Sequence, residues 1–164
     1  VGFLALFACP KPTVVAINGA AIAGGLFFVL GSDVRLSVAT ARVGLAEVRV
    51  GADFPIGPLE IARATLDPNV LRRLMLTGQP IDAERALAAG IVDEIVPQEQ
   101  LKSSAIAQAV ELAHIPPQTY ASVKRQIRGA VCDQIEHAMA HGANAPDGGW
   151  FNDETVAAMK RMIG

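Results

Sequence analysis

The sequence has little cysteine, few aromatic residues and no surplus of basic charge. Cys9 and Cys132 are the only two cysteines among 164 residues, so we expect neither a disulfide framework nor a cysteine metal site. This usage predicts a reducing compartment, the cytoplasm. The net charge of −2 argues against a nucleic-acid partner. The hydrophobic fraction of 51% excludes a disordered chain.

The sequence also contains no apolar run that reads as a membrane span. The most apolar window, residues 13–30, is interrupted by Asn18 and by glycines, and its β-branched residues gather in its first part. We therefore expect a strand, a turn and a helix there rather than a spanning helix, and no membrane association. No G-x-S-x-G segment is present, which excludes a serine peptidase reading.

The apolar residues that are present are mostly Ala, Val, Ile and Leu, which suits helices packed on a sheet in an α/β fold. The patterns divide the chain into a strand-containing part, 1–97, and a helical part, 98–164. Val1–Ala8 resembles the end of a helix whose beginning lies upstream. Strands are expected at 13–17, 33–37, 42–45 and 91–96, and helices at 23–31, 59–65, 69–77, 81–87 and 153–162, the last after a hinge at 144–149.

Several segments occur in an order that resembles one protein family. They are 11–25, Asp33, 44–47, 76–86 and 90–96. The series resembles the enoyl-CoA hydratase/isomerase family, the crotonases. The resemblance implies a crotonase-like ββα spiral, of which this chain is the later part only, followed by a helical C-terminal oligomerisation region. It also implies an acyl-CoA substrate, no separate cofactor because CoA belongs to the substrate, and a homotrimer or homohexamer.

Gly24 is the first candidate site residue. It opens the predicted helix at 23–31, where free backbone N–H groups and the helix dipole stabilise negative charge. A tight strand-to-helix turn explains the same glycines without any function. The resemblance places Gly24 at one oxyanion-hole donor of the family, with the second donor in an upstream portion. The family usually has a third glycine where this chain has Ala23.

Glu47 is the second candidate. It lies among apolar neighbours, so it is either an exposed carboxylate at a strand end or a partly buried one whose pKa is raised. The resemblance places Glu47 at a catalytic glutamate of the family. By the same resemblance, hydratases carry a second glutamate where this chain has Phe27, and phenylalanine cannot hold or protonate water.

Other positions around these two are expected to contact the substrate. They are Ala21, Ile22, Gly25, Phe27, Asp53 and Pro55. Asp53 also fits an ordinary solvated loop residue. His137 and His141 have a spacing that can bind metal, but surface histidines explain them better, so no metal site is expected.

With only one of the two glutamates, the chain is expected to be an enzyme that stabilises a thioester enolate and moves a double bond, or a related lyase. Two alternatives stay open. One is an enoyl-CoA hydratase in the strict sense. The other is a non-catalytic crotonase-like protein that binds CoA or serves assembly.

Overall fold

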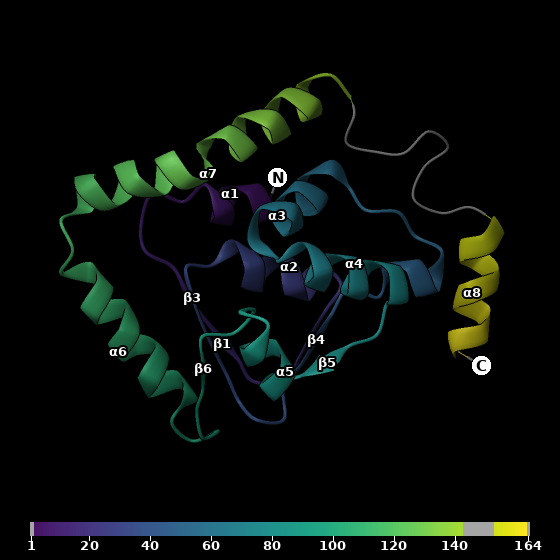
Figure 1. Ribbon diagram of the computed structural model, residues 1–164, viewed down its shortest axis with the longest axis horizontal. Coiled ribbons are helices and arrows are strands. Elements are labelled where there is room, and N and C mark those ends of the chain that lie inside the picture. The colour runs from purple at the N-terminus through teal and green to yellow at the C-terminus, as the bar shows by residue number, and fades with distance from the viewer. Residues whose placement is uncertain (1, 143–152, 164) are drawn as a thin grey trace.

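The computed structural model describes residues 2–142 and 153–163. Six short strands alternate with helices in its first part, and three helices follow (Figure 1). The strands are β1 Val14–Ile17, β2 Ala20–Ile22, β3 Val34–Ser37, β4 Arg42–Gly44, β5 Ile81–Asp82 and β6 Glu94–Ile95. The helices are α1 Gly2–Phe7, α2 Gly24–Gly31, the 3-10 helix η1 Glu47–Val50, α3 Ile56–Thr65, α4 Pro68–Thr77, α5 Ala83–Ala88, α6 Leu101–Ala113, α7 Pro117–Ala140 and α8 Asp153–Ile163.

The strands form two three-stranded sheets, with the orders β1-β3-β6 and β2-β4-β5. Each consecutive pair of strands contributes one member to each sheet, and a helix follows the pairs β1–β2 and β3–β4. All neighbours are parallel except β4 and β5. Because parallel neighbours point the same way, the segments that follow β2 and β4 emerge at one edge.

The core forms around α2, which is apolar on nearly every side. Leu26, Phe27, Val29 and Leu30 are buried and pack with side chains of the strands, whereas Phe28 is 49% exposed. A helix that is hydrophobic all round is typical of a buried position. The central placement of α2 fixes its N-terminus, and with it Gly24, relative to both sheets.

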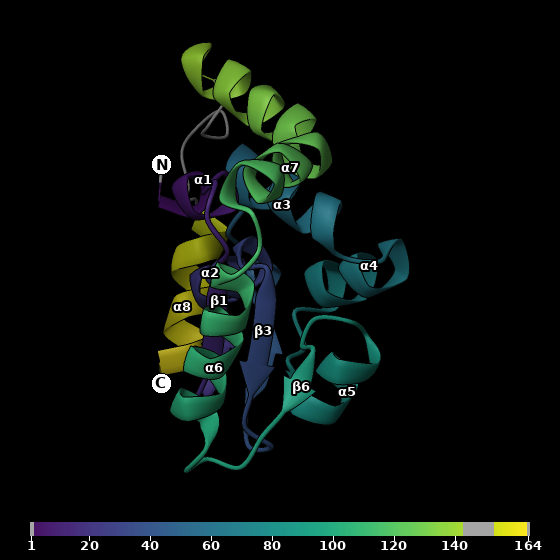
Figure 2. The same ribbon diagram turned by 90° about the vertical axis from the view of Figure 1, so that its left-hand side faces the viewer.

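The long helices of the C-terminal part cover the first part from two sides. Helix α6 lies along β1 and β3, and α7 crosses above α3 (Figure 2). Asp33, directly before β3, anchors α7: its Oδ2 accepts from Lys124 Nζ at 2.7 Å, and its Oδ1 lies 2.9 Å from Arg128 Nη2. Thr13 donates to the same carboxylate through its backbone N–H and its hydroxyl.

Most of the expected elements are confirmed, with corrections at their edges. Ala20–Ile22 is a strand that the sequence pattern did not reveal, and Ile81 starts β5 rather than a helix. The strand expected at 91–96 covers only Glu94–Ile95, and α3 begins three residues earlier than expected, at Ile56. Glu47 starts a 3-10 helix instead of ending a strand. The expected hinge at 144–149 lies outside the described residues.

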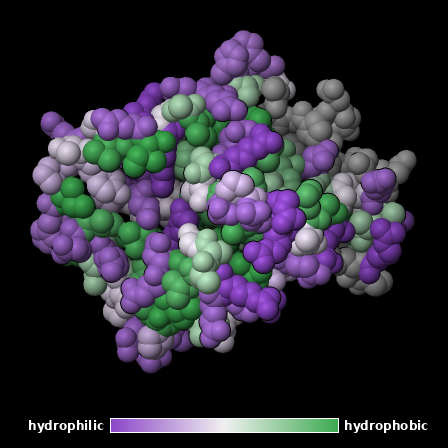
Figure 3. Space-filling view, in the orientation of Figure 1, coloured by the Kyte–Doolittle hydropathy of each residue, from purple (hydrophilic) through white to green (hydrophobic). Residues whose placement is uncertain are grey.

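Hydrophobic side chains remain exposed on the two long helices. Ile106 and Val110 on α6, and Val123 and Ile127 on α7, are each between 46% and 74% exposed. Figure 3 shows hydrophobic patches on the left of the face seen in Figure 1, the part of that view where α6 and the start of α7 are drawn. Within the described ranges, no helix is both long and apolar enough to cross a membrane.

Candidate active site

The structure brings Gly24 and Glu47 to the same edge of one sheet. Strands β2 and β4 are parallel, with Ile22 opposite Gly44. Helix α2 starts two residues after Ile22, and η1 starts three residues after Gly44. The Ala23 N–H donates to the Gly44 carbonyl at 2.8 Å and so fastens the two connections together. The carboxyl ends of neighbouring parallel strands form the crevice in which open α/β sheets bind ligands.

At Gly24 the chain offers backbone donors to this crevice. The first N–H groups of a helix have no acceptor within it, and no side chain of Ala23 caps α2. They point outward at the positive end of the helix dipole and can receive an oxyanion. A Cβ at Gly24 would meet Phe3 Cζ at 3.7 Å and, apart from adjacent backbone, no other described atom within 4 Å. A ligand can therefore approach this backbone closely.

Ala23 has a backbone conformation that normally requires glycine. Its φ is 52° and its ψ is −124°, and it is the one residue other than glycine with a positive φ in the described part of the chain. Such conformations cost about 1–3 kcal/mol and persist only when the surroundings impose them. Here the hydrogen bond from Ala23 N–H to Gly44 and the buried helix α2 impose this backbone conformation. The conformation in turn sets the orientation of the Ala23–Gly24 peptide.

Glu47 is half-buried, and burial raises the pKa of its carboxyl although its own backbone N–H partly offsets this by hydrogen bonding. Its Oε2 is buried and has no hydrogen-bond partner among the described residues. Buried polar atoms are normally paired, and an unpaired one marks a place where a ligand or water binds. A carboxylate with a raised pKa and a free oxygen is suited to accept a proton near neutral pH.

Two contacts that the sequence did not predict fix the η1 turn. Arg49 Nε donates to the Thr77 carbonyl at the end of α4, at 2.9 Å, and Thr155 Oγ1 of α8 donates to the Gly51 carbonyl at 2.6 Å. A Cβ at Gly78 would lie 2.7 Å from Arg49 Cγ, so this glycine allows the close approach. The Glu47 turn is therefore held between α4 and α8.

Phe27 is 2% exposed and contacts two other aromatic rings. Its ring centroid lies 5.5 Å from that of Phe3 and 6.3 Å from that of Phe54, the latter edge-on. Phe54 belongs to the loop after η1, so this contact joins α2 to the segment that follows Glu47. Phe3 and Phe54 were not singled out from the sequence, where nothing but their residue type marks them.

The remaining sequence candidates lie around this edge in different environments. Ala21 is buried, Ile22 and Pro55 are half-buried, and Gly25 and Asp53 are exposed. Within the ranges described, no group of three metal-ligating side chains occurs. His137 and His141 have ring centroids 4.2 Å apart on the exposed surface of α7, with the His141 ring nitrogen beside the His137 carbonyl.

Comparison with known proteins identifies the family of this chain. The enoyl-CoA hydratase/isomerase model matches residues 2–145, most of the chain. The chain belongs to this family. Among curated relatives, a probable enoyl-CoA hydratase of Mycobacterium tuberculosis is 36% identical over 125 residues, 75% of this chain and 47% of the relative. An (E)-benzylidenesuccinyl-CoA hydratase of Thauera aromatica is 32% identical over 115 residues, 70% of this chain and 45% of the relative. The chain thus spans about half the length of these family members.

Solved structures agree with the family assignment. An enoyl-CoA hydratase/isomerase of Pseudoalteromonas atlantica superposes with a TM-score of 0.86 at 25% identity, covering 98% of this chain and 65% of that one. An enoyl-CoA isomerase of Mycobacterium tuberculosis gives a TM-score of 0.80 at 30% identity, covering 84% and 61%. The chain therefore has the α/β fold of the enoyl-CoA hydratase/isomerase family.

Proposed function

We propose that the complete protein is an enzyme that acts on acyl-CoA thioesters, with Glu47 as the base and the Gly24 N–H as one oxyanion donor. The observation that carries this proposal is the buried Glu47 Oε2, which has no hydrogen-bond partner among the described residues and belongs to the turn at the sheet edge where α2 begins. A thioester carbonyl bound to those donors makes the neighbouring carbon acidic, because the enolate charge develops on the bound oxygen.

The reaction that we propose is movement of a double bond. Glu47 removes a proton from the α carbon of a 3-enoyl thioester, and the electrons pass through the double-bond system to the carbonyl oxygen. Return of a proton to the γ carbon gives the 2-enoyl thioester, with the double bond shifted and no atom lost. One carboxylate suffices for both transfers. No separate cofactor enters, since CoA is part of the substrate.

Hydration is the second candidate, because several relatives are named hydratases. The packing of Phe27 argues against it. At the position of the second glutamate of hydratases, this chain has a side chain that is 2% exposed and lies between two other rings. A phenyl ring has no group that could hydrogen-bond the attacking water. A protein that binds CoA without turnover stays the alternative to both.

We further propose that the spiral of ββα units and its helical oligomerisation region are completed in a homotrimer or homohexamer. The exposed apolar residues of α6 and α7 support this, since exposed apolar patches are typical of surfaces that bind another subunit. Light scattering of the complete protein tests it, and a monomer contradicts it. The two free thiols support the cytoplasm as the compartment.

The test of the chemistry is proton exchange in the complete protein. Glu47→Gln keeps the shape of the side chain but removes the base, so we expect the exchange of deuterium from solvent into the acyl chain to fall about 10²–10⁴-fold. Isomer formation should fall in parallel, and acyl-CoA affinity should stay within a few-fold. Glu99→Gln, an exposed glutamate, is the matched control. Near-normal exchange in Glu47→Gln excludes Glu47 as the base.

A further inference from the structure

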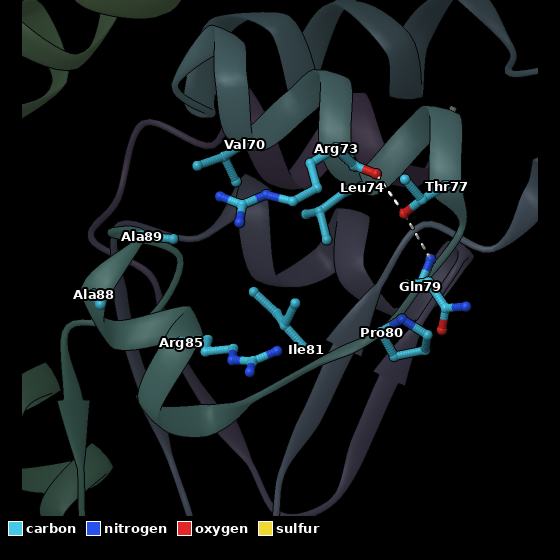
Figure 4. A pocket seen from close by; sticks show the side chains of 10 residues that line it. All are labelled: Val70, Arg73, Leu74, Thr77, Gln79, Pro80, Ile81, Arg85, Ala88 and Ala89. Carbon is cyan, nitrogen blue, oxygen red and sulfur yellow. Dashed lines mark hydrogen bonds between the residues drawn. The ribbon is translucent and has the colours of Figure 1, made fainter.

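A cleft lies between α4 and α5, and neither Glu47 nor Gly24 lines it. Its volume is about 860 Å³, within the range of small-molecule sites. The lining residues are Val70, Arg73, Leu74, Thr77, Gln79, Pro80, Ile81, Arg85, Ala88 and Ala89. Figure 4 shows the side chains of Arg73 and Arg85 extending into this space from the two helices, with Leu74 and Ile81 between them.

The charges of this cleft are unbalanced. Two arginines line it and no acidic residue does. Arg85 has one weak ionic contact, with 3.8 Å between its Nε and Asp82 Oδ2, whose other oxygen is taken by the Arg85 backbone N–H. In the part of the chain that the structure describes, the Arg73 guanidinium has no ion pair or hydrogen bond. Both arginines are exposed to solvent beside the apolar wall, so their guanidinium groups are accessible to an anion.

We propose that this cleft binds a small organic anion. Its carboxylate or phosphate group lies between Arg73 and Arg85, whose planar guanidinium groups match the oxygens of such groups, and its apolar body lies against Leu74 and Ile81. Neither Glu47 nor Gly24 lines the cleft, so anion binding is measured without turnover. Thr77 is shared with the site only through its backbone carbonyl, which accepts the Arg49 hydrogen bond.

The test uses the complete protein and two probes with the same ring, phenyl phosphate and benzoate, titrated by calorimetry. We expect saturable binding of at least one, and the comparison tells which anionic group the cleft prefers. The double change Arg73→Gln with Arg85→Gln should weaken binding about 10- to 100-fold, the range of charged hydrogen bonds. Arg72→Gln is the matched control, since Arg72 is the exposed neighbour on α4 outside the cleft.

A second variant tests the cleft without changing charge. Ala88→Phe places a ring in the space from α5 and should also weaken binding. Thermal unfolding checks that each variant is folded. Absence of saturable binding by the unchanged protein overturns the proposal. So does an equal loss in Arg72→Gln, which indicates general charge attraction, or binding that survives in both the double variant and Ala88→Phe.

Discussion

Arg49 Nε donates a hydrogen bond to the Thr77 carbonyl oxygen at 2.9 Å and so ties the turn that begins with Glu47 to the end of α4. Thr77 also closes its helix, with its hydroxyl donating to the Arg73 carbonyl and accepting from the Gln79 N–H. Arg49 is therefore a positioning residue: its guanidinium binds the end of α4 and fixes the backbone that presents the Glu47 carboxylate.

Arg49→Met should lower kcat about three- to tenfold. The variant loses one hydrogen bond, whose net contribution is about 0.5–1.5 kcal/mol, and the backbone of the Glu47 turn becomes less restricted. The pH at which kcat reaches half its maximum should move toward the ordinary pKa of a glutamate as Glu47 becomes better solvated. The KM should change less than kcat. Arg72→Met on the surface of α4 is the control, and an unchanged pH profile in Arg49→Met contradicts the positioning role.

Ala23→Gly should make the protein more stable. The φ of 52° and ψ of −124° favour glycine, and the relief of about 1–3 kcal/mol exceeds the entropic cost of about 0.5–1 kcal/mol for adding a glycine. Denaturant unfolding of the complete protein measures the change. Ala20→Gly, in the exposed part of β2, lacks such a conformation and should destabilise instead. Equal losses in both variants show that Ala23 is not strained.

Burial raises the pKa of Glu47, which gives a signed prediction for stability against pH. Between the ordinary pKa of a glutamate, about 4.3, and its raised value, the folded protein binds more protons than the unfolded chain. The free energy of unfolding contributed by this group therefore falls as the pH rises through that window. Glu47→Gln should remove the fall and stabilise the protein near neutral pH but not at acid pH. Glu99→Gln should leave the pH dependence unchanged.

Asp33 should change the stability with pH in the opposite direction. Burial alone would raise the pKa of Asp33, but the hydrogen bond from Lys124, the charge of Arg128 and the bonds from Thr13 outweigh it and hold the pKa below its ordinary value. The contribution of Asp33 to the free energy of unfolding is complete above the pKa of an aspartate in the unfolded chain. It is lost as the pH falls through the lower pKa that Asp33 has in the folded protein.

Removing the Asp33 charge should cost more than removing an exposed one. Asp33→Asn leaves Lys124 and Arg128 buried without their counter-ion, for which about 3–5 kcal/mol is typical. Asp133→Asn breaks an exposed ion pair on α7, the helix that carries Lys124 and Arg128, in which Asp133 Oδ1 lies 2.8 Å from Arg125 Nη2. This change should cost less than about 1 kcal/mol of unfolding free energy. Urea unfolding of both variants measures the difference, and similar losses contradict a structural role for the Asp33 network.

The sequence predicted what local signals determine. Asp82 caps α5 by accepting from the Arg85 N–H, and Asp is a residue type that favours this position. Gly78 ends α4 with a φ of 62°, a conformation that favours glycine. It could not predict partners that lie far along the chain. The pairing of β2 with β4 revealed Ala20–Ile22 as a strand, and Asp33 meets Lys124 across 91 positions. No spacing rule encodes such contacts, and the surroundings of Glu47 depend on them.

Phe27→Glu tests what separates isomerisation from hydration in this site. The change puts a second carboxylate at the position that the family resemblance assigns to the second glutamate of hydratases. Two carboxylates can hold a water between them and supply the proton for hydration. We expect the complete variant protein to hydrate a 2-enoyl thioester above the background of the unchanged protein, with oxygen from labelled water appearing at the β carbon. Mass spectrometry of the product measures this label.

The same change should destabilise the fold. Phe27 is 2% exposed and touches the rings of Phe3 and Phe54, so a carboxyl group there loses those contacts and its own hydration, a combination that costs about 2–5 kcal/mol. Phe28→Glu is the control on the same helix. Its ring also contacts Phe3, at 4.8 Å between centroids, but Phe28 is 49% exposed, so a carboxylate there stays solvated and should cost less stability. This variant should not hydrate the 2-enoyl thioester. A folded Phe27→Glu protein without labelled product shows that a second carboxylate is not what this site lacks. Label in the Phe28→Glu product shows that the new activity does not come from the position of Phe27.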